Sequence, residues 1–505
     1  MKITIMDTTL RDGEQTSGVS FTASEKLNIA KLLLEDLNVD RIEIASARVS
    51  EGEYQGARLI FDWAGEHGLL DRVEVLGFVD GEISLKWIQE AGGRVNNLLM
   101  KGSLKHCMNQ LRKTPEEHIA DVKHVLATAR DMGIRMNIYF EDWSNGMRNS
   151  PEYMYQVLDA LKDESIERYM LPDTLGILNQ QETYDFCMDM INRYPELNFD
   201  FHAHNDYDLA TANVFSAIRA GITGIHTTVN GLGERAGNVP LSSVIGVVKD
   251  HFRYEMNIRE DRLYHVSKII ESFSGIRIPA NKPLIGENVF TQTSGIHADG
   301  DHKDDLYFND LLPERFGRKR TYALGKMSGR ASILKNLEEL GIELSKEDMK
   351  LVTERVIELG DKKEIITKED LPYIISDVLR SQRVEEKIRI RNFQLSVARG
   401  LRSVATVAIE IDCQVHEETS SGDGQYDAFM KALWNIYDRL HKKHPTLTDY
   451  VVSIPPGGKT DALVECTITW DYNGNIIKTR ALDPDQTVAA IKCTTRMLNI
   501  IESYG

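Results

Sequence analysis

The sequence predicts an α/β protein: a (β/α)8 TIM barrel, then a helical linker subdomain, then a C-terminal α+β domain. Short apolar runs alternate with segments of helical period eight times in the first half of the chain. Long charged helical segments follow, and a βββα pattern then occurs twice. We therefore expect domains at 1–270, 271–385 and 386–505, because such alternation is typical of parallel barrels.

Eight apolar, often β-branched runs mark the expected barrel strands. They begin near Ile3, Val39, Val73, Val95, Met136, Arg168, Asn198 and Gly224. Helical segments such as 25–37 and 120–133 separate them at a repeat of about 32 residues, which indicates parallel strands with crossover helices. An open doubly wound sheet is the alternative. It normally has a glycine-rich dinucleotide turn after its first strand, and here RDGEQ follows instead.

The C-terminal part reads as a duplicated unit. Strand-like runs at 388–398 and 404–418 precede a helix at 426–440, and the pattern repeats up to a helix at 488–501. A duplicated small α+β unit behind a barrel indicates a binding or regulatory domain rather than a second catalytic centre. The segment between the barrel and this domain is mostly helical and charged.

Composition argues against several classes of protein. The 60 basic and 77 acidic residues give a formal net charge of −17 without a basic face, so we expect no nucleic-acid partner. No apolar run approaches the roughly 18 residues of a membrane helix, and no membrane partner is expected. The five cysteines form no CxxC, which argues against a disulfide framework. MKITIMDTTL lacks the layout of a signal peptide, so we expect a cytoplasmic protein.

Polar residues gather where the expected strands end, and barrel enzymes place their catalytic groups there. These residues are Arg11, Asp12, Glu14, Glu43, Tyr139, Glu141, Asp173, Thr174, His202, His204, Asn205, Asn230 and the loop 231–238.

The stretch FDFHAHNDYD (199–208) carries the strongest signal. Its period of two puts the apolar Phe199, Phe201 and Ala203 on one face and His202, His204 and Asp206 on the other. A solvated edge strand is the alternative explanation. Two neutral imidazoles and a carboxylate, however, suit a divalent cation that keeps open positions for substrate.

Asp12 is the expected carboxylate ligand, because strand one closes the barrel near strands seven and eight. Asn238, at a neighbouring strand end, is a further candidate ligand.

Four long motifs resemble the signatures of the DRE-TIM metallolyases, the Claisen-condensing family of isopropylmalate, homocitrate and citramalate synthases. They are DTTLRDGEQTSG (7–18), FHAHND (201–206), NGLGERAGN (230–238) and GIHADG (295–300). The resemblance covers the whole chain, including the linker and the duplicated C-terminal domain. Within the family it is strongest to the citramalate synthases, through EIASARVS, VLGFVDG, YFEDWSNG, LPERFGRKR and IPPGGKTDALVE.

The resemblance implies a mechanism. A divalent metal (Mn, Mg or Zn) on Asp12, His202, His204 and Asn238 would chelate a 2-oxo acid, and acetyl-CoA would be the co-substrate. Arg11 would stabilise charge developing on the keto oxygen.

The resemblance also assigns roles to four further residues. Thr174 would hold the carboxylate of the acceptor, and Glu141 and Tyr307 would take part in proton handling. His297 would be the base, reaching the barrel mouth of a partner subunit in a homodimer. A surface-loop histidine is the alternative for His297.

The acceptor follows from Tyr139. It lies two residues before Glu141 on the same inner face, where isopropylmalate and homocitrate synthases typically carry a serine. With Leu76 and Leu99 it would form an apolar wall that fits the methyl of pyruvate, unless it merely fills the barrel interior. Domain 386–505 would bind a branched-chain amino-acid effector, isoleucine above all, between its two βββα halves, where the glycine-rich turns 420–425 and 455–462 would offer backbone N–H groups. A dimerisation domain without a ligand is the alternative.

Four other functions compete with citramalate synthesis. A 2-isopropylmalate synthase, acting in leucine rather than isoleucine biosynthesis, differs only in its larger 2-oxo acid. A lyase or aldolase usually lacks the βββα duplication. A non-haem iron oxygenase usually has a jelly-roll sheet, and a binding protein without activity has no use for polar strand ends.

Overall fold

The structure is a computed structural model that describes residues 1–303, 306–361, 366, 368–379, 387–412, 414–453 and 464–503. The chain forms two compact units, Met1–Phe290 with Phe308–Arg320 and Thr291–Tyr307 with Thr321–Gly505. The three-part division at 270 and 385 stays a prediction. None of the described helices has the length and apolar character needed to cross a bilayer.

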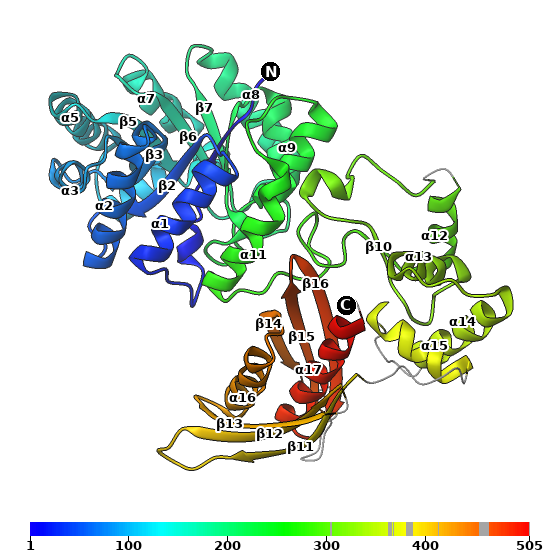
Figure 1. The fold of residues 1–505 in the computed structure, drawn as a ribbon. Coiled ribbons are helices and arrows are strands. Elements are labelled where there is room, and N and C mark those ends of the chain that lie inside the picture. Colours follow the sequence, from blue (N-terminus) through cyan, green and yellow to red (C-terminus); the bar gives the residue numbers. More distant parts are fainter. Residues whose placement is uncertain are drawn as a thin grey trace. The chain divides into compact units, whose positions relative to one another are not determined.

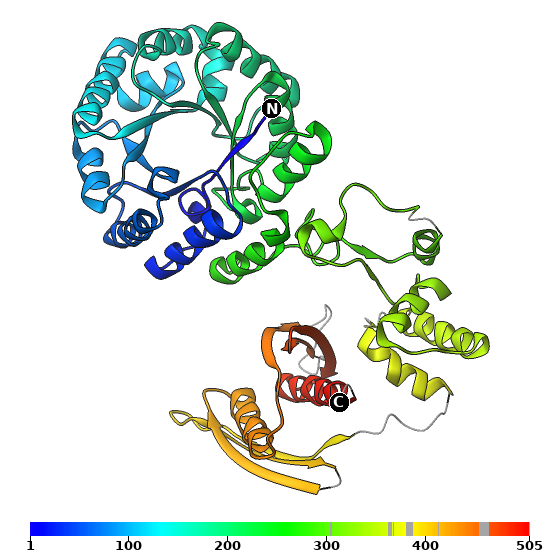
Figure 2. The same ribbon diagram turned by 45° about the horizontal axis from the view of Figure 1, so that its top comes forward.

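Eight parallel strands close into a barrel in chain order, and β1 pairs with both β2 and β8 (Figures 1 and 2). The strands are β1 (Thr4–Asp7), β2 (Arg41–Ser46), β3 (Val73–Phe78), β4 (Val95–Lys101), β5 (Arg135–Glu141), β6 (Arg168–Asp173), β7 (Phe199–Ala203) and β8 (Gly224–Thr227). Each begins within two residues of the apolar run that predicted it. The prediction of a (β/α)8 barrel is confirmed, and the open doubly wound sheet is wrong.

Helices surround the barrel (Figure 2). They are α1 (Ala23–Lys31), α2 (Glu51–Glu66), α3 (Ile83–Ala91), α4 (Leu104–His106), α5 (Pro115–Met132), α6 (Trp143–Asn149), α7 (Pro151–Leu161), α8 (Gln180–Arg193), α9 (Ala210–Ala220), α10 (Leu241–Gly246) and α11 (Leu263–Ser274).

Local sequence fixes where these helices begin and end, as α5 illustrates. The Thr114 hydroxyl accepts the N–H of Glu117, and the Glu117 carboxylate accepts the N–H of Thr114, so two unpaired donors of the first turn are satisfied. Pro115 occupies the first position, where no N–H is needed. Gly133 ends the helix with a φ of +71°, in the left-handed region.

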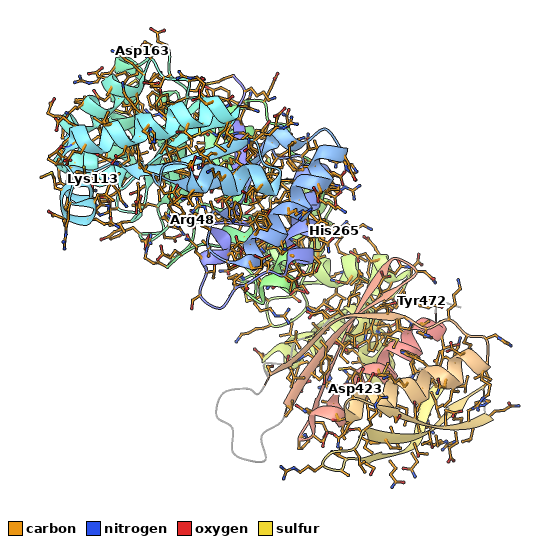
Figure 3. All side chains as sticks on the ribbon, turned by 90° about the vertical axis from the view of Figure 1, so that its left-hand side faces the viewer. Arg48, Lys113, Asp163, His265, Asp423 and Tyr472 are labelled. Carbon is orange, nitrogen blue, oxygen red and sulfur yellow. The ribbon has the colours of Figure 1, made fainter. Side chains whose placement is uncertain are left out.

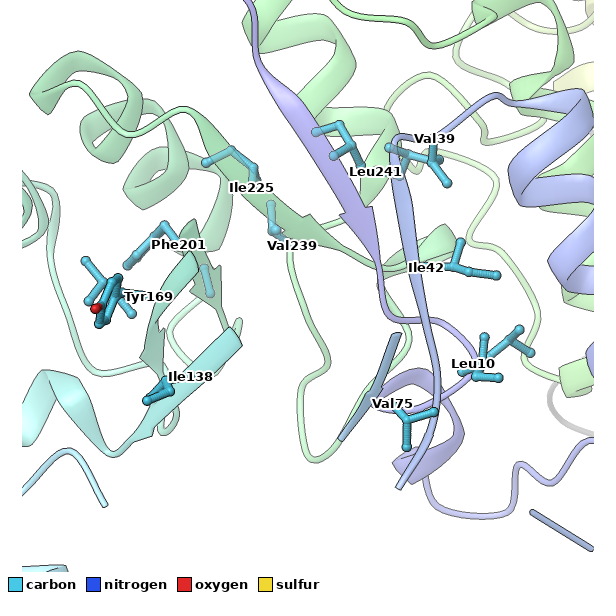
Figure 4. Close-up of a cluster of buried hydrophobic side chains, with 14 of the residues drawn as sticks. Leu10, Val39, Ile42, Val75, Ile138, Tyr169, Phe201, Ile225, Val239 and Leu241 are labelled. Atoms are coloured by element: carbon cyan, nitrogen blue, oxygen red, sulfur yellow. The ribbon is translucent and has the colours of Figure 1, made fainter. Parts of the chain in front are cut away.

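The main core lies between the strands and the helices. Ile42, Val75, Ile138, Phe201 and Ile225 are buried there, on the faces of their strands that pack against helices (Figure 4). Charged side chains of the barrel surface, among them Lys113 and Asp163, project outward (Figure 3). This division follows from the period of two along each strand.

The barrel interior is unusually polar. Barrel interiors are filled mainly by branched apolar residues, yet several buried side chains on the inner faces of these strands carry a carboxylate, an amide or an imidazole. They are Glu43, Glu74, Asn97, Asn137, Asp200 and His226. Buried polar groups need partners, and their partners define the site below.

The second unit contains a helical part and two βββα units. The helical part comprises β9 (Thr291–Gln292), α12 (Gly295–His302), β10 (Thr321–Tyr322), α13 (Arg330–Leu340), α14 (Lys346–Asp361) and α15 (Leu371–Leu379). The βββα units are β11 (Ile388–Ser396), β12 (Ser403–Ile411), β13 (Gln414–Gly422) and α16 (Gln425–Arg439), then β14 (Thr446–Ser453), β15 (Val464–Tyr472), β16 (Asn475–Asp483) and α17 (Gln486–Ser503). Each unit forms a three-stranded antiparallel sheet in chain order, with β12 or β15 between its two neighbours. The predicted duplication is therefore confirmed.

Of the two glycine-rich turns expected to bind an effector, 420–425 links β13 to α16. There the N–H of Asp423 donates to the Asp427 carboxylate at 2.9 Å, so this donor is already engaged. The turn 455–462 lies outside the described residues.

Candidate metal centre

Asp12, His202 and His204 come together at the carboxyl ends of β1 and β7. Each offers a ligand atom within 4.8 Å of the others, and all three side chains are buried. The Nε2 atoms of His202 and His204 lie 3.5 and 3.8 Å from Asp12 Oδ2. Strands β1 and β7 both pair with β8, which brings residues 190 positions apart in sequence into contact.

The electrostatics of this cluster favour a cation. Burial alone would raise the pKa of Asp12, but the Arg11 guanidinium and the two imidazoles hold it well below its ordinary value. Burial lowers the pKa of both histidines, despite the opposing attraction of Asp12. The site therefore offers an ionised carboxylate and two neutral imidazoles, which is the donor set that divalent metals bind.

Asn238 completes the cluster from the loop after β8. Its Nδ2 donates to Asp12 Oδ1 at 2.8 Å and to the carbonyl of Leu232 at 3.1 Å. Its Oδ1 is buried and has no hydrogen-bond partner among the described residues, so this oxygen is available to a ligand. The residues therefore fit a divalent metal.

The glycines of the loop 231–238 allow Asn238 to reach the cluster. A Cβ on Gly233 would lie 2.2 Å from Asn238 Nδ2, and one on Gly237 would lie 2.0 Å from the carbonyl oxygen of Gly231. Both Gly233 and Gly237 have positive φ, at +151° and +83°. A side chain at Gly233 would displace the Asn238 amide, and one at Gly237 would displace the backbone of Gly231.

Arg11 is held beside the cluster by three groups. Its Nη1 donates to Asp12 Oδ2 at 2.7 Å, its Nε to Glu43 Oε2 at 2.6 Å, and its Nη2 lies 3.4 Å from the Tyr139 hydroxyl. Glu43 is fully buried and also accepts from Thr8 and Asn97. The guanidinium is thus fixed beside the three candidate ligands.

Thr174 and Glu141 lie at neighbouring strand ends. The Thr174 hydroxyl accepts the N–H of Asp142 at 2.9 Å, which leaves its own hydrogen free to be donated. The Thr174 carbonyl accepts from Arg235 at 2.7 Å. Glu141 forms an ion pair with Lys101.

Tyr139, Leu76 and Leu99 are also brought together, as the sequence predicted. They form a cluster inside the barrel with Met6 and Met170. Tyr139 and Leu76 are buried, whereas Leu99 is only partly buried. The Tyr139 ring centroid lies 5.9 Å from that of His202, so the apolar wall adjoins the candidate ligands.

His297 and Tyr307 belong to the second unit and contact each other. Their ring centroids are 4.2 Å apart, and His297 Nδ1 lies 3.1 Å from Gln292 Oε1. Tyr307 is exposed.

Two other polar residues singled out in the sequence are engaged elsewhere. Asp206, expected beside His202 and His204, instead accepts two hydrogen bonds from the guanidinium of Arg235. Glu14 pairs with the buried Lys26.

Sequence reasoning missed two residues of the barrel interior, Asp200 and His226. Asp200 precedes His202 by two positions, so its inward direction was available from the period of two. His226 lies in the run GIHTT, and nothing local to that run distinguishes it. Their partners come from strands remote in sequence, which no local pattern reports.

Three family matches cover most of the chain. The HMGL-like family matches residues 2–270, the "Homocitrate synthase post-HMGL domain-like" family matches 284–364, and the "LeuA allosteric (dimerisation) domain" matches 365–502.

Relatives of similar length extend the match over nearly the whole chain. A protein of Methanopyrus kandleri named as an (R)-citramalate synthase is 35% identical, covering 97% of this chain and 95% of the relative. Methanocaldococcus jannaschii has two relatives at 32% identity, each covering 99% of this chain. One is an (R)-citramalate synthase, covered over its full length, and the other a 2-isopropylmalate synthase, covered over 95%.

These matches agree with the resemblance that the motifs predicted. The chain belongs to the HMGL-like family, among the relatives that carry citramalate and 2-isopropylmalate synthase names.

Proposed function

We propose that this chain is an acyltransferase that condenses acetyl-CoA with pyruvate and hydrolyses the product to (R)-citramalate and CoA, in isoleucine biosynthesis. The observation that carries the proposal is the cluster of Asp12, His202 and His204 with Arg11 beside it and the wall of Tyr139 next to it.

Asp12, His202 and His204 would hold the metal, with the free Oδ1 of Asn238 as a further ligand. A divalent metal bound there would supply Lewis acidity toward the keto oxygen of the acceptor. Metal analysis of the purified protein would identify this ion as Mn, Mg or Zn.

Residues of the homodimer would carry out the remaining steps. His297 would remove a proton from the methyl group of acetyl-CoA, and the new C–C bond would join this carbon to the keto carbon of the acceptor. Arg11 would stabilise the negative charge that develops on the keto oxygen. Thr174, whose hydroxyl hydrogen is free, would donate to the acceptor carboxylate.

Proton transfer completes the reaction. We assign Glu141 and Tyr307 to it, together with His297. The keto oxygen takes up a proton to become the hydroxyl of the product, and water then cleaves the thioester and releases CoA.

The apolar wall beside the candidate ligands supports pyruvate as the acceptor. The names of the relatives do not distinguish pyruvate from 2-oxoisovalerate as the acceptor, because the two M. jannaschii relatives are equally similar to this chain. Tyr139, Leu76 and Leu99 supply an apolar wall beside the ligands. The extra methyls of 2-oxoisovalerate would displace packed side chains, and each methylene of misfit costs roughly 1–3 kcal/mol.

A CoA-release assay tests the function. The purified protein, supplied with Mn²⁺, should release CoA from acetyl-CoA when pyruvate is present and release little without a 2-oxo acid. We expect kcat/KM for pyruvate to exceed that for 2-oxoisovalerate at least tenfold. Comparable values would promote the alternative, a 2-isopropylmalate synthase. No release with any 2-oxo acid would contradict the condensation.

We further propose that the C-terminal domain binds a branched-chain amino acid, with isoleucine as the first candidate, and that it mediates a homodimer. The support is the match of residues 365–502 to the LeuA allosteric (dimerisation) domain. Millimolar isoleucine should inhibit the full-length enzyme, and the mass in solution should correspond to a dimer. Indifference to both isoleucine and leucine would contradict the effector assignment.

A further inference from the structure

A chain of hydrogen bonds crosses the barrel interior below the candidate metal centre. The Tyr139 hydroxyl lies 2.9 Å from His226 Nδ1, and His226 Nε2 lies 3.2 Å from Asp200 Oδ2. All three side chains are at most 2% exposed. Strands β5 and β8 are not neighbours in the barrel, so the Tyr139–His226 bond spans its interior.

The partners of Asp200 fix the direction of these bonds. Asp200 forms ion pairs with Arg41 and with Arg168, the latter at 2.8 Å, so it is a carboxylate and can only accept. His226 Nε2 therefore carries a hydrogen and donates it to Asp200. In the neutral imidazole Nδ1 is then an acceptor, and the Tyr139 O–H donates to it.

The charged form of His226 does not fit this arrangement. Both ring nitrogens would then donate, and the phenol hydrogen would need another acceptor. Among the described residues, the other hydrogen-bond partner of the hydroxyl is Arg11 Nη2 at 3.4 Å, which can only donate. The neutral imidazole with its hydrogen on Nε2 gives Tyr139, His226 and Asp200 each a matching partner in this chain of hydrogen bonds.

This chain of hydrogen bonds sets the position of a ring in the apolar wall that would limit the size of the acceptor. The Tyr139 ring clusters with Leu76 and Met170 and meets the rings of His202 and His226 edge to face, at centroid distances of 5.9 and 5.4 Å. Without an acceptor at His226, the buried hydroxyl would have no acceptor for its own hydrogen, and the ring would turn toward another. An apolar residue could fill the place of His226 without the cost of burying a polar ring.

We infer that His226, supported by Asp200, is a positioning residue for acceptor selectivity: it holds the Tyr139 phenol across the pocket and so keeps the pocket small. The inference rests on the proposed function, because it assigns His226 to the discrimination between 2-oxo acids.

Three variants and a double variant test it. His226→Phe keeps an aromatic ring and removes both hydrogen bonds. Tyr139→Phe removes only the phenol oxygen. His226→Asn places an amide oxygen near the position of Nδ1 and keeps an acceptor for Tyr139. The measured quantity is the ratio of kcat/KM for pyruvate to kcat/KM for 2-oxoisovalerate.

We expect His226→Phe to lower this ratio roughly 3- to 10-fold, the range for loss of one hydrogen bond. Tyr139→Phe should lower it by a similar factor. The double variant should be no less selective than either single variant, because both act through the same bond. His226→Asn should retain more of the selectivity than His226→Phe.

An unchanged ratio in folded His226→Phe, or additive effects in the double variant, would overturn the inference while the proposed function stands. If His226→Phe does not fold, as judged by circular dichroism, Tyr139→Phe decides alone, and an unchanged ratio there overturns it. A wild type that condenses no 2-oxo acid removes the proposed function itself.

Discussion

The amide nitrogen of Asn238 donates a hydrogen bond of 2.8 Å to Oδ1 of Asp12, across 226 positions of sequence. This bond turns Asp12 Oδ2 toward the imidazoles of His202 and His204. It also leaves Asn238 Oδ1 free in a buried place.

Asn238→Ala should therefore weaken metal binding without removing it. Groups that orient a ligand typically account for 10- to 100-fold in metal affinity, and we expect a loss of about that size. Titration with Mn²⁺ followed by activity and by metal content measures it. An unchanged affinity would show that Asp12 needs no such support.

Asp12→Asn removes the only carboxylate of the three-residue cluster. We expect CoA release to fall on the order of 1,000-fold, because several kcal/mol of charge stabilisation leave with the metal. Chelation of the wild type should have the same effect, and added Mn²⁺ should restore it. Asp206→Asn is the matched control, since Asp206 binds Arg235 and should leave metal content unchanged. Full activity with unchanged metal content in Asp12→Asn would remove the assignment.

Arg11→Lys keeps the positive charge but cannot reproduce a planar guanidinium held by Asp12, Glu43 and Tyr139. We expect kcat to fall roughly 100- to 1,000-fold, as for other donors aimed at a developing oxyanion. The KM for pyruvate should change much less. A raised KM with an unaltered kcat would instead assign Arg11 to ground-state binding.

Leu76→Ala should enlarge the pocket. We expect kcat/KM for 2-oxoisovalerate to rise about 10-fold or more and that for pyruvate to fall, because a misfit of one or two methylenes is worth that much. The buried Leu76 also stabilises the barrel, so the variant should lose about 2–5 kcal/mol of unfolding free energy. A loss of stability with unaltered selectivity would mean that Leu76 only fills the interior.

Asp7 should make the barrel less stable as the pH rises from 4 to 7. Burial raises the pKa of Asp7 from 3.8 to about 6, although its bonds to Thr9 and Thr227 oppose this. Between these values the folded state holds a proton that the unfolded state has lost, so stability falls with rising pH and levels off above 6. The difference amounts to about 3 kcal/mol.

Asp7→Asn removes this effect and keeps an acceptor for the N–H of Thr9. Its free energy of unfolding, measured with urea, should rise relative to that of the wild type by up to about 3 kcal/mol between pH 4 and pH 7. Asp163→Asn, which removes an exposed carboxylate, is the matched control and is measured in the same way. An equal difference between Asp7→Asn and wild type at both pH values would contradict a raised pKa.

The sequence by itself determined the eight strands, the duplicated βββα units and the direction of His202 and His204. Each of these follows from a short-range period, of two residues in strands and 3.6 in helices, which reports which side chains share a face. It also singled out Asp12 and Asn238, because they follow expected strands.

Tertiary structure alone decided which of these side chains meet. Closure of β1 onto β8 brings Asp12 to the histidines, and the positive φ of Gly233 and Gly237 lets Asn238 reach Asp12. Asp206 shares the histidine face by sequence, yet it turns to Arg235 because β7 has already ended at Ala203. The bond between Tyr139 and His226 depends on two strands that are not neighbours. Such pairings are set by barrel closure and strand register, and those are properties of the whole sheet rather than of any segment.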